Sequence, residues 1–365
     1  MMPAPNLFLM IPVLTATAQT LVDGRPGVVL EGRVAQAAAD VSGGSIVQFQ
    51  FKDQRLNPLS WTSEEPGPAH PMGHFLCLDR WGAPSDPESR NGMPFHGEAS
   101  HVHWTVVRPP SASADGMQAE MAATLPMAGF KVTRSLRLAD GVAVLRVTES
   151  VTNANKLGRV YNMVQHPSIA PPFLDATTVV DANARKGFMQ SSPLPNPEEP
   201  AVFWPQALED GQPVNLRQLT ADHDPEVVSF TIDDEYGWVT ASTATKGLLI
   251  GYIWKTADYP WLDIWRNAQN GKPAARGLEF GTTGLHQPVG ILLSKGKIFG
   301  RPIFAYLDAG QTATRSYAAF LFKIPGDYRG VERITYEAGR LILHERGADP
   351  AHDLVMTTGD LFANP

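Results

Sequence analysis

The stretch from residue 130 to residue 151 reads Phe130-Lys131-Val132-Thr133-Arg134-Ser135-Leu136-Arg137-Leu138, then Ala139-Asp140-Gly141, then Val142-Ala143-Val144-Leu145-Arg146-Val147-Thr148-Glu149-Ser150-Val151. The two outer runs alternate apolar and polar residues, which is typical of β-strands with one buried face. An Asp-Gly pair between such runs predicts a β-hairpin with a tight turn, because glycine accepts the positive φ that this turn requires. The stretch therefore favours β structure.

Similar short alternations, bounded by Gly, Pro, Asn or Asp, occur on both sides of this hairpin, whereas helical periodicity is scarce. We expect further strands at 102–107, 119–125, 159–164, 227–232, 237–242, 247–254, 316–323, 334–336 and 341–344. Loops rich in Pro and Gly interrupt them at 61–74, 82–97 and 193–213. Long loops in a compact fold often carry function. We find neither a linker nor an internal repeat, and we expect one domain over 19–365.

The composition fits a folded, β-rich protein. Of 365 residues, 43% are hydrophobic and 18% charged, and the 32 glycines and 31 prolines supply many turns. The net charge of -7 is spread without acidic or basic runs. This argues against nucleic acid and anionic membranes as partners and favours a neutral or small polar ligand.

The start of the chain resembles an export signal. An apolar run, Leu7-Phe8-Leu9-Met10-Ile11-Pro12-Val13-Leu14, precedes Ala16 and Ala18, which are spaced as in a signal-peptidase site. We expect residues 1–18 to be a signal peptide and the protein to be periplasmic or secreted. Since residues 1–6 contain no Lys or Arg, the alternative is a buried first strand in a cytoplasmic protein. The single cysteine, Cys77, excludes an intrachain disulfide, and we expect it to be a buried strand residue.

Three segments combine titratable side chains with aromatic residues and glycine. They are 77–82 leading to Gly92-Met93-Pro94-Phe95-His96-Gly97-Glu98-Ala99, then Tyr161-Asn162-Met163-Val164-Gln165-His166-Pro167, and finally Tyr259-Pro260-Trp261-Leu262-Asp263-Ile264-Trp265 followed by Arg276-Gly277-Leu278-Glu279-Phe280-Gly281. A strand core alone would not need these groups. They are the candidates for a functional site.

The order of these segments resembles the galactose mutarotase (aldose 1-epimerase) superfamily over roughly residues 28–323. The resemblance lies in a His-Gly after a proline-containing loop, a second histidine about 70 residues later at a strand end, and a Gly-Leu-Glu further on. It implies an all-β fold, a large antiparallel β-supersandwich with a sugar-binding cleft on one sheet face. It also implies an isomerase that interconverts sugar anomers by acid/base ring opening, without a cofactor.

By the same resemblance, each site residue has an expected role. Glu279 would be the base that takes the proton of the anomeric hydroxyl, and His166 the acid that protonates the ring oxygen. His96, the third member of the catalytic set, and Arg80 would hold ring hydroxyls. Trp265 would face the C–H side of the sugar, and Asp263 is the nearest candidate for the family's substrate-binding aspartate. The partner would be a small-molecule sugar or an oligosaccharide.

Structural readings of the same residues stay open. Glu279 could pair with Arg276, His166 and His96 could be satisfied loop histidines, Arg80 could pair with Asp79, and Trp265 could belong to the core. Pro167 and Ser168 stand where the family has an aromatic pair, which leaves a noncatalytic carbohydrate-binding protein as the alternative function. A polysaccharide lyase or hydrolase is a third, for which an accessory α-helical domain is missing.

Two places in the sequence carry side chains that could bind a metal ion. His101 and His103 would share one face if 102–107 were a strand, and His96 or Glu98 could complete a metal site. Residues 86–92 offer oxygen ligands but lack the spacing of a calcium loop. The alternation of His101 and His103 with Val102 and Trp104 also fits an ordinary half-buried strand, and we expect no metal.

Overall fold

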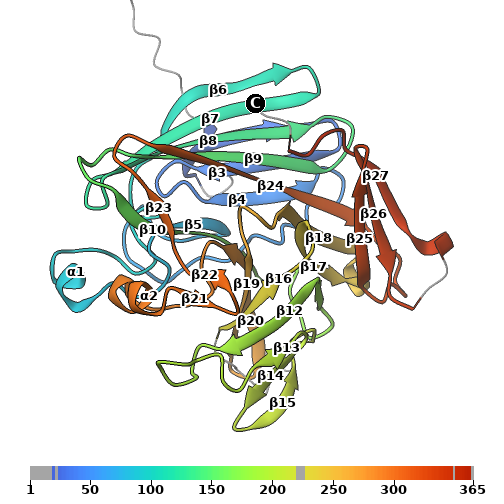
Figure 1. Ribbon diagram of the computed structural model, residues 1–365. Coiled ribbons are helices and arrows are strands. Elements are labelled where there is room, and N and C mark those ends of the chain that lie inside the picture. Colours follow the sequence, from blue (N-terminus) through green and yellow to red (C-terminus); the bar gives the residue numbers. More distant parts are fainter. Residues whose placement is uncertain (1–18, 21–23, 219–226, 348–349, 363–365) are drawn as a thin grey trace, which may run out of the picture.

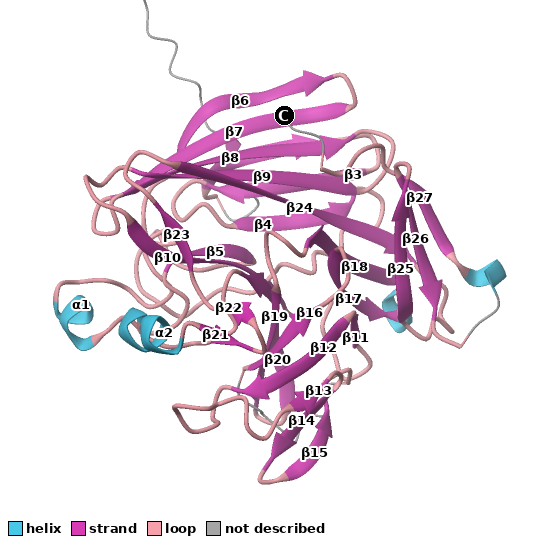
Figure 2. Ribbon diagram, in the orientation of Figure 1, coloured by secondary structure: helices cyan, strands magenta, loops and turns pink. Residues whose placement is uncertain are grey.

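The computed structural model describes residues 19–20, 24–218, 227–347 and 350–362, and within them it is built almost entirely of antiparallel β-strands (Figures 1 and 2). The predicted signal peptide, 1–18, lies outside the described residues. The described helices are short, and none is long and apolar enough to cross a membrane. The prediction of an all-β, large antiparallel fold is confirmed.

The larger sheet has twelve strands and carries the functional site described below. In spatial order they are β1 (Gln19–Thr20), β2 (Pro26–Glu31), β3 (Ala35–Asp40), β4 (Ile46–Phe51), β5 (His74–Asp79), β10 (Arg159–Ile169), β20 (Lys272–Gly281), β19 (Trp261–Gln269), β16 (Val228–Ile232), β12 (Ala184–Met189) and β13 (Val202–Phe203), with β23 (Ala305–Leu307) also paired to β10. Strands from distant parts of the sequence therefore meet at its centre, where β10 and β20 are neighbours.

The second sheet has eight strands and packs against the first. Its order is β11 (Val179–Ala182), β17 (Tyr236–Thr243), β18 (Leu248–Lys255), β24 (Thr312–Lys323), β9 (Val144–Asn153), β8 (Phe130–Ala139), β7 (Gly116–Leu125) and β6 (Thr105–Ser113). Smaller elements are the hairpins β14–β15 (Gln206–Glu209, Gln212–Asn215) and β21–β22 (Lys297–Ile298, Arg301–Pro302), the sheet β25–β27 (Val331–Glu337, Arg340–Glu345, Leu354–Thr357), the α-helices α1 (Asp86–Arg90) and α2 (Val289–Lys295), and the 3₁₀ turns Ala244–Lys246 and Pro350–His352.

The predicted hairpin is present as β8 and β9, but its turn is not tight. Leu138 pairs with Leu145, so the chain makes a wider connection, and Gly141 does not adopt a positive φ. The neighbouring strand explains this. Ala139 still pairs with Gly116 of β7, and the Asp140 amide donates to the Asp115 carbonyl. Pairing with β7 thus keeps β8 extended through Ala139, past the residue at which a two-residue turn would reverse the chain.

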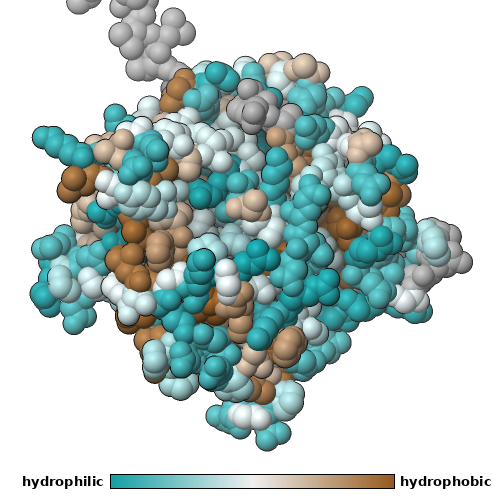
Figure 3. Space-filling model, in the orientation of Figure 1, coloured by the Kyte–Doolittle hydropathy of each residue, from teal (hydrophilic) through white to brown (hydrophobic). Residues whose placement is uncertain are grey.

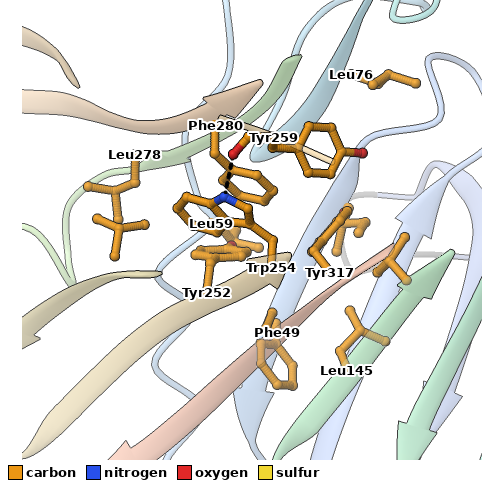
Figure 4. Packing of buried hydrophobic residues seen from close by; sticks show 14 of the residues in the cluster. Phe49, Leu59, Leu76, Leu145, Tyr252, Trp254, Tyr259, Leu278, Phe280 and Tyr317 are labelled. Atoms are coloured by element: carbon orange, nitrogen blue, oxygen red, sulfur yellow. Dashed lines mark hydrogen bonds between the residues drawn. The ribbon is translucent and has the colours of Figure 1, made fainter. Parts of the chain in front are cut away.

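The main core fills the space between the two sheets. Along β8 and β9, every second residue faces inward, as the sequence pattern predicts. Figure 4 shows the centre of this core, where the rings of Trp254 and Phe280 stack at 4.2 Å and the Trp254 indole N–H donates to the Tyr259 carbonyl at 2.8 Å. Inward residues of β20, such as Phe280, therefore anchor the strand whose opposite face carries Glu279.

A polar network is buried in the same core. The Arg134 guanidinium donates to the Glu149 carboxylate at 2.6 Å and also to the Gly44 carbonyl. The other Glu149 oxygen accepts from the Gln165 amide at 2.6 Å, and Gln165 in turn contacts His74 at 3.1 Å. The network joins β8 and β9 of one sheet to β5 and β10 of the other.

One predicted strand begins later than expected. Strand β6 starts at Thr105, so His101 and His103 precede it and do not share a strand face. His101 instead contacts the Glu65 carboxylate at 2.8 Å. The geometric basis for a metal site at these histidines is therefore wrong. The other predicted strands agree with β7, β10, β16, β17, β18, β24, β25 and β26, and Cys77 is buried in β5 as predicted.

Candidate functional site

Five side chains form one row across the outer face of the twelve-stranded sheet, the face turned away from the main core. Strand by strand the row is Phe75 (β5), His166 (β10), Glu279 (β20), Asp263 (β19) and Ser229 (β16). The flanking pairs Gln165–Phe280 and Ser168–Gly277 place His166 opposite Glu279. Directly opposed residues of antiparallel strands project to the same face and touch. Register alone therefore brings an imidazole and two carboxyl groups together.

A cavity of about 270 Å³ lies over this row. Its lining consists of Trp61, Ser63, Glu65, Pro71, Phe75, Trp81, Phe95, His96, His166, Val227, Trp265, Glu279 and His286. A mostly apolar wall with a few converging polar groups is typical of a small-molecule site. A larger cavity, about 830 Å³, lies between β17 and β25, but the described residues that line it include no histidine and hence no carboxylate–imidazole pair.

Glu279 is the buried carboxyl group at the base of the cavity, with 1% of its surface exposed. One oxygen accepts from the Trp81 indole N–H at 2.7 Å, and the other lies 3.1 Å from His166 Nε2. Burial raises the pKa of Glu279 well above its usual value, and neighbouring Asp263 raises it further, while the Trp81 bond opposes the shift. A Cβ at Gly277 would come within 2.8 Å of the Glu279 carboxylate, so the glycine leaves this group room.

His166 is held on two sides. Its Nδ1 lies 3.0 Å from the Ser168 hydroxyl, and its ring stacks on Phe75 at 4.1 Å. Nε2 is thereby directed at Glu279. Burial lowers the pKa of His166 to about 3. The imidazole and the carboxyl group are thus shifted in opposite directions, and both shifts favour the neutral forms.

His96 comes from the loop after α1 and reaches the same cavity. Its backbone has a φ of 65°, and its main chain and ring both bond to Gly82: the His96 amide donates to the Gly82 carbonyl at 3.0 Å, and the Gly82 amide donates to His96 Nδ1 at 3.1 Å. Because Nδ1 accepts, the ring proton is on Nε2. Burial lowers the pKa of His96 well below its usual value.

The remaining walls are aromatic. Trp265 lies edge-on to Trp61 at 5.8 Å and to His166 at 5.9 Å. His286 completes the opposite side, 5.6 Å from His96, and burial lowers its pKa to about 4. The structure therefore brings Glu279, His166, His96 and Trp265 together. It adds His286, Trp61 and Trp81, which sequence reasoning did not assign. Trp81 lies within a quoted segment, but no pattern in the sequence marks His286.

Several solved structures with the same architecture are described as mutarotase-like. A galactose mutarotase-like protein from Clostridium acetobutylicum is 14% identical, with a TM-score of 0.64 over 84% of this chain and 98% of that one. A galactose mutarotase related enzyme from Lactobacillus acidophilus is 12% identical, with a TM-score of 0.59 over 81% of this chain and 97% of that one. This chain has the galactose mutarotase-like fold. No protein-family model and no curated protein matches its sequence.

Two of the residues expected to hold a ligand, Arg80 and Asp263, do not line this cavity. Arg80 does not line the cavity: its side chain is only 5% exposed and is held by Asp79, at 2.8 Å, and by Glu88. Asp263 also lies outside the lining and is buried beside Glu279. Burial raises the pKa of Asp263 well above its usual value, and the nearby Ser229 hydroxyl partly opposes this shift. Asp263 therefore neighbours Glu279, whose pKa it raises, without lining the cavity.

Among the described ranges, no group of three or more His, Cys, Asp or Glu side chains is arranged to hold a metal ion. The three cavity histidines are spaced as separate hydrogen-bonding groups, with ring centres 5.4 Å apart for His96 and His166.

Proposed function

We propose that this protein is an aldose 1-epimerase-like isomerase that interconverts the anomers of a free sugar. The observation that carries the proposal is the contact of 3.1 Å between His166 Nε2 and Glu279 Oε1 in an aromatic cavity. Ring opening needs one group that removes a proton and one that supplies it, a short distance apart, and a carboxyl group beside an imidazole meets this need.

The reaction requires one proton on the pair. In ring opening, the anomeric hydroxyl gives its proton to the Glu279 carboxylate, the C1–O5 bond breaks as the C1 carbonyl forms, and His166 gives its proton to O5. The open sugar then rotates about C1–C2. Ring closure on the other face of the carbonyl reverses both proton transfers: O5 returns its proton to His166, and Glu279 gives its proton to the anomeric oxygen. The pair therefore ends in the protonation state in which it began. The raised pKa of Glu279 and the lowered pKa of His166 favour the form with the proton on Glu279, so the form that starts ring opening, with the proton on His166, is the minor one.

The lining favours an uncharged sugar. Among the described residues that line it there is no Lys or Arg, the pKa of each of the three imidazoles is lowered, and the acidic groups are Glu65 and Glu279. A phosphate or carboxylate on the substrate would find no cation to balance it. Trp61 and Trp265 offer apolar faces for the C–H side of a pyranose, and His96 Nε2–H can donate to a hydroxyl.

The test is anomer exchange, measured by polarimetry or saturation-transfer NMR across a panel of free aldoses. We expect wild type to accelerate exchange of at least one sugar, and Glu279→Gln and His166→Ala each to lose about 10²- to 10⁴-fold. Glu120→Gln, on β7 of the other sheet, is the matched control and should keep the rate. A Glu279→Gln variant as fast as wild type would refute the assignment.

A noncatalytic carbohydrate-binding protein is the second candidate. The positions of Arg80 and Asp263 favour it, because two of the groups expected to hold ring hydroxyls do not reach the cavity. It predicts equal sugar affinity in wild type and Glu279→Gln, with no acceleration by either.

A further inference from the structure

A second cavity, of about 450 Å³, lies beside the first on the same face of the large sheet. It is lined by Arg25, Ala38, Val47, Gln48, Gln50, Asn57, Leu59, Ser60, Trp61, Thr62, His70 and Met72. Its floor is formed by outward residues of β3 and β4, whose inward neighbours Ala37 and Phe49 belong to the main core. Trp61 borders both cavities.

The segment around residues 60–72 forms the wall between the cavities. Thr62 and Met72 form a β-bridge, so the backbone is extended on both sides of the wall. Trp61, Ser63 and Pro71 line the first cavity, whereas Ser60, Thr62, His70 and Met72 line the second. Trp61 also lies 5.8 Å from Phe75, next to the Glu279–His166 pair. A ligand that passes Trp61 would occupy both spaces.

Gln50 marks the second cavity as a binding site. Its side chain is 8% exposed and lines the cavity, yet among the described residues its amide has no hydrogen-bond partner. The amide is open to the cavity, since neither of its polar atoms is among the fully buried atoms that lack a hydrogen bond. Gln50 therefore holds a donor and an acceptor ready for a polar ligand.

The second cavity fits a neutral, hydroxyl-rich ligand. Arg25, its one arginine, is already paired with Asp40 at 3.3 Å and with the Pro68 carbonyl. The Thr62 hydroxyl and His70 Nε2 contact each other at 3.2 Å on its exposed side. An amide, a hydroxyl, an imidazole and an indole are the groups that hold a sugar ring.

We propose that the second cavity binds a further sugar unit, so that the protein acts on the reducing end of an oligosaccharide. This rests on the proposed function for its direction: ring opening requires a free anomeric hydroxyl at Glu279, so the chain can extend only from the non-reducing side of the first sugar. The second sugar unit would lie beyond Trp61 and form hydrogen bonds with the Gln50 amide.

The experiment compares glucose with maltose, cellobiose and isomaltose, and galactose with β-1,4-galactobiose, in anomer exchange and in direct binding. We expect at least one disaccharide to exceed its monosaccharide about tenfold in kcat/KM, and likewise in affinity. Gln50→Leu should raise KM and Kd for that disaccharide about 3- to 10-fold while leaving the monosaccharide unchanged. Ala38→Leu, which fills the floor of the cavity, should do the same by blocking it.

Gln118→Leu, on the outer face of the other sheet, is the matched control and should change nothing. Disaccharides that bind no better than monosaccharides, or cavity variants that weaken both alike, would overturn the proposal. If no sugar shows accelerated exchange, the isomerase proposal fails, and the affinity ratios alone decide whether the second cavity binds sugar.

Discussion

At the scale of single residues, the most informative pair is Asp263 and Glu279. Both carboxyl groups are buried and directly opposed across β19 and β20, and within the described chain neither is paired with Lys or Arg. Two such groups cannot both ionise at low cost, because the second charge would form beside the first. Asp263 therefore keeps a proton on the Glu279–His166 pair over a wider pH range.

Changing Asp263→Asn should move the alkaline limb of the pH–rate profile to lower pH. Without the neighbouring charge the pKa of Glu279 falls, so the pair loses its single proton at a lower pH. The acid limb, set by His166 with a pKa of about 3, should stay. The measurement is kcat/KM against pH for both proteins. An unchanged alkaline limb would mean that Asp263 has only a packing role.

The sequence predicts the site residues that lie on regular strands or follow a motif. His166, Glu279 and Trp265 meet because strand register puts them on one face. His96 belongs to the Pro94-Phe95-His96-Gly97 turn. Arg80 pairs with Asp79, as the alternative interpretation allows, and also with Glu88 of α1, a contact that neither spacing nor pattern reveals. His286 comes from the segment before α2, and its approach to His96 depends on packing between distant loops.

At the scale of elements, the buried ion pair between β8 and β9 helps to join the two sheets. Arg134 and Glu149 are opposed in register and point into the core, in contact with Gln165 of the other sheet. Their alternation with apolar residues predicts the strands correctly, but the sequence does not show that these two charged residues face inward. The turn at Asp140 and the start of β6 escape prediction for a related reason, since neighbouring strands set both.

Replacing Arg134→Met should lower the free energy of unfolding by about 3–5 kcal/mol, because it leaves the Glu149 charge buried and unpaired. The double variant Arg134→Met, Glu149→Leu should recover much of the loss. Urea denaturation measures both. Ser135→Ala, one residue along β8 on the outer face, is the control and should change stability by less than about 0.5 kcal/mol. A single variant as stable as the control would contradict this account.

At the scale of the whole molecule, buried histidines link stability to pH. Burial lowers the pKa of His74, His96, His166 and His286. The unfolded chain binds protons at a histidine near 6.5, whereas folded His286 binds one only near 4, so the unfolded state is favoured increasingly as pH falls through this window. The contribution is absent above 6.5.

In His286→Gln, the free energy of unfolding should fall less between pH 6.5 and about 4 than in wild type. The unfolded variant has one histidine fewer to protonate in this range. The slope of unfolding free energy against pH, from urea titrations at several pH values, measures this directly. Parallel slopes for the two proteins would show that His286 does not contribute. Hydrophobic residues gather on the side of β10, β23 and α2 in Figure 3, and Leu293 of α2 is 51% exposed, so aggregation in acid should be followed alongside.

The strand order of the large sheet also bears on how the protein comes into being. Strand β20 is inserted between β10 and β19, and β5 pairs on the far side of β10, so the reacting groups meet only through contacts between remote parts of the chain. Such topologies have high contact order and fold slowly. During synthesis, His166 can contact Glu279 only after β20 has been translated. A shift of one residue in the register of β20 would place Leu278 or Phe280 opposite His166 instead of Glu279. The pairing of His166 with Glu279 is therefore among the last contacts that the folding chain acquires.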